Sequence, residues 1–101
     1  MLYRVTIDVD ADIAEEWLAW MRAVHVPHVL RQPGFSRAVI ARERDATRFV
    51  IDYTVEGQEA LDRYLAEGAA CVRAEHEARY GGRARASRQV LEVVGTVERL
   101  S

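Results

Sequence analysis

The chain has 101 residues with 14 basic and 16 acidic side chains, so its formal net charge at pH 7 is −2. This length predicts one domain over residues 1–101, and a hydrophobic share of 50% excludes a disordered chain. The balanced charge excludes a broad basic surface for nucleic acid, and no apolar run reaches the roughly 20 residues of a membrane helix. A single cysteine excludes an internal disulfide, and the first ten residues do not resemble a signal peptide, so we expect a cytoplasmic protein.

Apolar and polar side chains alternate over the first ten residues, a period typical of a strand with one buried face. A helix is expected next, because Asp12 can accept a hydrogen bond from a backbone N–H at the helix start and Glu15 follows three residues later, as in a capping box. Apolar side chains then recur at steps of three and four and share one helix face. They are Ile13, Trp17, Trp20, Met21 and Val24.

Pro27 interrupts this helical pattern. Proline lacks the N–H and disfavours helical geometry at the preceding residue, so we expect a kink or break near residues 25–26 and one further turn to Leu30. Pro33 and Gly34 predict a turn. Residues 35–43 and 49–55 predict two strands, and the short link between them favours an antiparallel hairpin.

A second helix is predicted from Gly57, as its N-terminal cap, to the pair Gly81 and Gly82, which suits the left-handed geometry of a helix end. Its expected buried face consists of Leu61, Tyr64, Leu65, Gly68, Val72 and His76. Residues 88–97 predict a fourth strand. The order strand, helix, strand, strand, helix, strand predicts an α+β, ferredoxin-like βαββαβ fold, with a four-stranded antiparallel sheet covered on one face by two helices. The uncovered face predicts a homodimer that assembles through sheet faces.

Two motifs resemble the signature of a family of short bacterial proteins of unknown function within the dimeric α+β-barrel superfamily. The first motif contains Trp17, Trp20, Met21, His25, Val26, Pro27, Val29, Leu30, Gly34 and Phe35. The second motif contains Glu75, His76, Arg79, Tyr80, Gly81 and Gly82. The resemblance implies a dimeric α+β barrel with a ligand cavity between helices and sheet.

The resemblance does not select an activity. The superfamily includes cofactor-free monooxygenases, isomerases, cyclases, haem-degrading enzymes and proteins with no known chemistry, and fold alone does not choose among them. The family often carries bulky aromatic side chains after the double glycine, where this chain has Ala84, Ala86 and Ser87. This difference predicts extra room beside the second helix.

The candidate catalytic residues are His28, His76 and Arg79. Imidazole titrates near neutral pH and can move protons, while an arginine fork can hold a carboxylate or an enolate. The candidate ligand-binding residues are Trp17, Trp20, Met21, His25, Tyr53 and Tyr80. They predict a protein that binds a small molecule and that could catalyse acid/base chemistry next to a carbonyl without a cofactor.

A non-catalytic homodimerisation or interaction module is the alternative hypothesis. In that case His25 would cap carbonyls freed by Pro27, and Glu75, His76 and Arg79 would form a structural network. The three histidines with Glu75 also have the donor types of a metal site. The prediction nevertheless names no metal and no cofactor. The expected partners are a second copy of the chain and a small molecule, with neither nucleic acid nor membrane.

Overall fold

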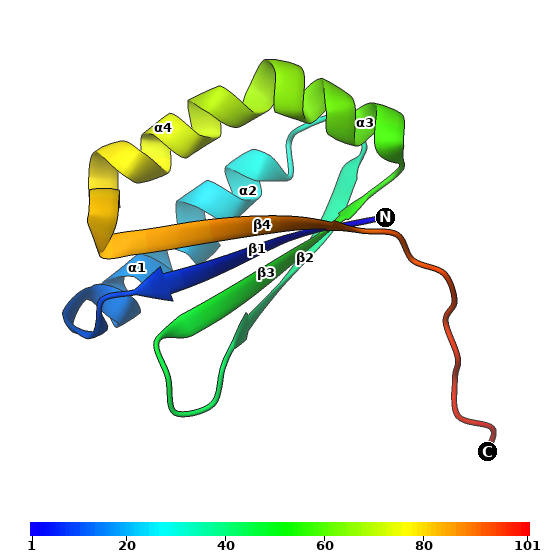
Figure 1. The fold of residues 1–101 in the computed structure, drawn as a ribbon, viewed down its shortest axis with the longest axis horizontal. Coiled ribbons are helices and arrows are strands. Elements are labelled where there is room, and N and C mark those ends of the chain that lie inside the picture. Colours follow the sequence, from blue (N-terminus) through cyan, green and yellow to red (C-terminus); the bar gives the residue numbers. More distant parts are fainter.

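A computed structural model describes all residues from 1 to 101. Its sheet contains β1 (Leu2–Val9), β2 (Phe35–Arg42), β3 (Arg48–Val55) and β4 (Ala84–Leu91), in the spatial order β2-β3-β1-β4 with antiparallel pairing throughout. All helices lie on one face of this sheet (Figure 1). The predicted ferredoxin-like α+β fold is therefore confirmed. None of the helices has the length and apolar character required to cross a membrane.

Alternation along β1 and β3 divides the sheet into two faces, because successive side chains point to opposite sides. The helix-facing side chains of these strands are buried and join a core of 20 hydrophobic residues. Trp17 at the centre of this core is fully enclosed, with its ring 4.8 Å from the ring of Phe49. The core thus fixes the first helical segment against β3.

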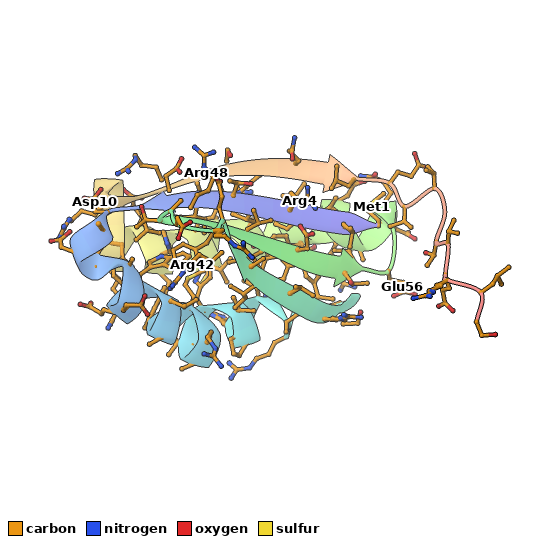
Figure 2. The ribbon with its side chains drawn as sticks, turned by 90° about the horizontal axis from the view of Figure 1, so that it is seen from below. Met1, Arg4, Asp10, Arg42, Arg48 and Glu56 are labelled. Carbon is orange, nitrogen blue, oxygen red and sulfur yellow. The ribbon has the colours of Figure 1, made fainter.

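Paired charges occupy the uncovered face of the sheet. Arg4 of β1 binds Asp52 of β3 at 2.7 Å, and Arg48 of β3 binds Asp8 of β1 at 2.8 Å. Figure 2 labels both arginines on their strands. The pairs make this face semi-polar, as the alternation predicts.

The first helical segment does not break near residues 25–26, where a kink or break is predicted, but its regular α-helix is interrupted there by a π-helical turn. It consists of α1 (Ala14–Trp20), a π-helical turn η2 (Met21–His25) and α2 (Val26–Val29). The backbone of Val26 keeps helical angles, with φ of −63° and ψ of −45°. A π turn bonds residue i to i+5, and this wider turn accommodates the proline without a break. Val24, predicted to be buried, is 45% exposed as a result.

The second helical segment has the same construction. It runs through α3 (Gln58–Arg63), a π-helical turn η3 (Tyr64–Gly68) and α4 (Ala69–Tyr80). Gly57 precedes its first residue and Gly81 follows its last with φ of +55°, so both predicted ends are confirmed. Leu65 lies inside the π turn and is 42% exposed, which contradicts its place in the predicted buried face.

The predicted capping box does not form. Asp12 belongs to a short 3₁₀ turn, η1 (Ala11–Ile13), and no side chain caps the start of α1. The Asp12 carboxylate instead binds Arg83, which lies in the 3₁₀ turn η4 (Gly81–Arg83) after α4. An ion pair between distant segments has replaced the local cap.

The fourth strand begins earlier and ends earlier than the predicted range 88–97. Its pairing with β1 runs from Val9 opposite Ala84 to Leu2 opposite Leu91. Because β1 itself starts at Leu2, residues beyond Leu91 have no strand to pair with. Residues 92–101 accordingly have no regular secondary structure and extend away from the sheet (Figure 1).

Candidate functional site

A small cavity lies between the helical layer and the sheet. Its volume is about 30 Å³, which is room for one or two water molecules. Tyr3, Tyr53 and Tyr64 line one part of it, and His25 and His76 line the helical side. Met21, a predicted ligand-binding residue, is also in the wall.

His76 projects from α4 and is held by the core. The Trp17 indole Nε1–H donates a hydrogen bond to His76 Nε2 over 2.9 Å. An indole nitrogen only donates, so His76 Nε2 carries no proton and the neutral ring carries its proton on Nδ1. Burial lowers the pKa of His76 and favours this neutral form. Towards a ligand, His76 is therefore a hydrogen-bond donor.

His25 and His28 both approach Glu75 of α4. The Nδ1 atom of His25 lies 3.5 Å from Glu75 Oε1, and the Nδ1 atom of His28 lies 3.3 Å from Glu75 Oε2. His25 Nδ1 and Glu75 Oε1 are buried and have no other partner. The carboxylate thus joins two turns of the first helical segment to the second.

The two histidines differ in their access to the cavity. His25 lines it, whereas His28 does not, and the His28 side chain is 31% exposed. Burial, followed by the charge of His76, lowers the pKa of His25 to about 4, while Glu75 opposes the shift. His25 is therefore a neutral ring at the cavity wall, in the place predicted for His28.

Trp20, Tyr80 and Arg79 form a stack at the end of α4. The Trp20 ring lies 5.5 Å from the Tyr80 ring, and both lie about 6 Å from His76. The Arg79 guanidinium sits over Trp20 at 5.3 Å and is exposed. These three predicted site residues surround His76 from outside and do not line the cavity.

Three phenol rings line the cavity, Tyr3 and Tyr53 from the sheet and Tyr64 from η3. Tyr53 packs against Tyr3, with ring centroids 6.1 Å apart, and Tyr3 packs edge-on against Tyr64 at 5.8 Å. Burial raises the pKa of Tyr53 and raises that of Tyr64 to about 12, so both hydroxyls keep their protons. Tyr53 lies on the inward face of β3, as the sequence predicts.

An open groove continues the cavity outwards between α4 and β4. It has a volume of about 570 Å³, within the range of small-molecule sites. Ala84 and Ala86 line its β4 side, and His76 is shared by groove and cavity. The groove lies where small residues after the double glycine predict extra room beside the second helix.

Two arginines at this opening escaped sequence analysis. Arg73 of α4 and Arg88 of β4 line both the cavity and the groove. The predicted strand 88–97 begins at Arg88 and leaves out Ala84 and Ala86, so the alternation that places Arg88 on the helix-facing side could not be seen. Arg73 directly follows Val72, and no motif or spacing in the sequence marked it as a site residue.

The donors predicted for a metal site do not converge. His25, His28 and Glu75 gather on one side, but His76 Nε2 is occupied by the Trp17 indole. No group of three or more His, Cys, Asp or Glu side chains has an arrangement that could hold a metal ion. The metal alternative is thus not supported by this geometry.

A larger open depression of about 770 Å³ lies elsewhere, beside Gly34 and α3. Its lining includes Glu56, Glu59 and Glu67 but no imidazole and no aromatic ring. It lacks the chemistry of the cavity and is not the candidate site.

Solved structures share the fold at low sequence identity. A mutant form of SnoaB, a cofactor-independent oxygenase from Streptomyces nogalater, has a TM-score of 0.73 and 20% identity, covering 97% of each chain. MhuD, a heme-degrader from Mycobacterium tuberculosis with two hemes bound, has a TM-score of 0.71 and 24% identity, covering 97% of this chain and 100% of its own. The ActVA-Orf6 monooxygenase of Streptomyces coelicolor, in complex with nanaomycin D, has a TM-score of 0.63 and 20% identity, covering 96% and 91%. These likenesses support the ferredoxin-like fold.

No curated protein sequence matches the chain. Residues 1–94 match a family described as a domain of unknown function, DUF4286. The family resemblance inferred from the two motifs is consistent with this match, which spans both of them. The chain belongs to the DUF4286 family.

Proposed function

We propose that this protein binds a small, partly aromatic organic molecule in the groove between α4 and β4, with a polar group of the ligand directed at the adjoining cavity. The observation that carries the proposal is the position of His76, which lines both spaces. A ligand lying in the groove would meet this imidazole, and a ligand reaching the cavity would meet His25 and the tyrosines. The sharing of the fold with monooxygenases and a heme-degrader supports a small-molecule role.

The same groups support proton chemistry next to a carbonyl. His25 is neutral, and its Nδ1 lies 3.5 Å from Glu75 Oε1, so a proton held on Nδ1 leaves Nε2 as the nitrogen that can accept another. His76 and Tyr53 carry protons that can be donated to a developing oxyanion. The proton would pass from the carbon beside the carbonyl to His25, and the electron pair would move to the carbonyl oxygen.

A haem does not suit this site. The cavity of about 30 Å³ has no room for a macrocycle. His76, the imidazole shared by cavity and groove, already accepts the Trp17 N–H at Nε2, so this atom is not free to coordinate iron. The proposal therefore includes no haem-dependent step.

The second candidate function is an interaction module with structural histidines. It is favoured by the fact that all three imidazoles have protein partners, His76 in Trp17 and the other two in Glu75. In that case no organic molecule would enter the groove or the cavity.

Nuclear magnetic resonance separates these two functions. Mixtures of planar aromatic ketones, phenols and carboxylates would be added to the labelled protein while the Trp17 indole N–H signal is followed. Ligand binding predicts shifts of this signal together with the amides of Arg73 and Arg88. The interaction module predicts no such shifts, and a response confined to the depression around Glu59 and Arg63 would also contradict the proposal.

Native mass spectrometry of the purified protein is an independent check. A reproducible added mass on the folded chain would support an occupied site and give the mass of the ligand. The same spectrum after mild acid release should return the bare chain.

A further inference from the structure

Two guanidinium groups without a carboxylate partner flank the opening of the site. Arg88 forms no ion pair and no hydrogen bond, while Arg73 donates only to the Tyr3 hydroxyl, over 3.0 Å. The neighbouring Arg85 differs, because it binds Asp10 at 3.1 Å. The positive charge of Arg73 and Arg88 is thus not neutralised by an ion pair with the protein.

Arg88 lies on the helix-facing side of β4, where a charged side chain is unusual. The register places it opposite Val5, a core residue, and on the same face as Ala84 and Ala86. An inward-facing position beside the core ordinarily takes an apolar side chain. Here the position holds an arginine, and the two alanines before it leave space in front of the strand.

The charge of Arg88 affects the pKa values of groups that line the cavity. Burial is the main influence on the pKa of His76, Tyr53 and Tyr64, lowering the first and raising the other two. The positive charge of Arg88 lowers the pKa of all three groups, so it opposes burial at the two tyrosines. The only carboxylate lining the groove is that of Glu77. The interior therefore has a positive field that an anion could neutralise.

We infer that Arg73 and Arg88 together bind the carboxylate of a planar organic acid whose apolar body lies along Ala84 and Ala86. The inference rests on the proposed function and adds to it the chemical class of the ligand. Guanidinium forks hold carboxylates with paired hydrogen bonds. The Tyr3 hydroxyl already accepts from Arg73, so its own proton is free to complete the anion site.

A different role would explain an inward-facing arginine without a ligand. A charge on an edge strand discourages pairing with the sheet of another molecule. That role predicts no preference for any ligand charge, so the two explanations differ in a measurable way.

The test compares naphthoate with naphthamide, two planar molecules that differ mainly in charge. Titration calorimetry would measure both with the full chain, with Arg88→Gln and with Arg73→Gln. Arg37→Gln is the matched control, since Arg37 is exposed on β2 and forms no ion pair. Thermal unfolding of each variant confirms that it is folded.

The expected result is that naphthoate binds about tenfold or more tightly than naphthamide, as charge-assisted hydrogen bonds predict. Arg88→Gln and Arg73→Gln should each weaken naphthoate by about tenfold and leave naphthamide unchanged, while Arg37→Gln leaves both unchanged. Equal affinity for the two probes would overturn the carboxylate site and leave the proposed function standing. If Arg37→Gln weakened naphthoate binding as much as the other two variants, general charge attraction would explain the affinity. That result would also overturn the carboxylate site. Binding of neither probe would contradict the proposed function together with the carboxylate site.

Discussion

His25 is enclosed at the junction of the two helical segments, against Trp20, His76 and Glu75. Burial first, and the charge of His76 next, lowers its pKa from 6.5 to about 4. The unfolded chain therefore takes up a proton near pH 6.5, whereas the folded chain takes it up only near pH 4. Stability is fully present above pH 6.5 and is lost as the pH falls towards 4. This fall in pKa corresponds to roughly 3 kcal/mol of unfolding free energy.

The first prediction is that unfolding free energy decreases between pH 7 and pH 4.5 and that His25→Gln flattens this dependence. Glutamine does not titrate, so the variant removes the proton uptake that distinguishes the two states. Urea unfolding at a series of pH values measures the slope. His28→Gln is the matched control, because it leaves the His25 ring enclosed, and it should keep most of the slope. An unchanged slope in His25→Gln would contradict the assignment.

At the scale of elements, the π turn η2 places the His25 imidazole. Side chains spaced by four residues are buried across each π turn, as in Trp17, Met21 and His25, or in Tyr64, Gly68 and Val72. On a regular α-helix each step of four drifts by about 40° around the axis. The wider turns η2 and η3 reduce this drift, so His25 and Trp17 share a face.

The same turns explain which parts of the site the sequence could predict. The strands β1 and β3 were predictable because each has one fully buried face with a period of two. The two wrongly predicted buried residues, Val24 and Leu65, both lie inside π turns, which a period of 3.6 does not describe. His76, Met21 and Tyr53 lie on the predicted faces, while His28 and Arg79 lie outside the cavity. The predicted strand 88–97 included Arg88, but its inward orientation was missed because the true start of β4 at Ala84 is set by pairing with β1, which is a tertiary constraint.

The second prediction concerns the π turn η2. A π turn corresponds to one extra residue in an α-helix. A variant lacking Val24 should therefore keep the flanking residues on their faces and remain folded, at a cost of about 3 kcal/mol because Pro27 then lies inside a regular helical turn. A variant lacking Ala74, in the regular helix α4, should rotate His76 and Tyr80 away from the core by about 100° and lose most of its stability. Circular dichroism with urea unfolding compares the two, and equal losses would contradict this view of η2.

At the scale of the whole molecule, the protomer exposes more surface than its mass requires. Its accessible surface is 6712 Å². A compact monomer of 11.5 kDa exposes about 5800 Å². The excess of about 900 Å² is close to the share that one partner buries in a standard interface. The extended segment 92–101, where Val97 is 96% exposed, contributes to this excess, and the uncovered sheet face is surface that a partner can bury.

The third prediction follows from this surface: the protein forms a homodimer through the uncovered sheet face. Val50 lies on that face of β3, opposite Thr6 of β1, between the ion pairs of Arg4 and Arg48. Native mass spectrometry should give about 23 kDa, twice the 11.5 kDa of the chain. Val50→Arg should give the single-chain mass at the same concentration, because an unpaired charge would then be buried against the partner.

The control for the dimer is Ala78→Arg, which places the same charge on the exposed side of α4. It should leave the dimer mass unchanged. Because Val50 is only half-buried in the protomer, Val50→Arg should also keep the helical content of the wild type, so that loss of the dimer is not loss of the fold. A dimer that persists in Val50→Arg but dissociates when residues 92–101 are removed would assign the contact to that segment instead. A monomeric wild-type protein would mean that the charge pairs Arg4–Asp52 and Arg48–Asp8 suffice to keep this face in water.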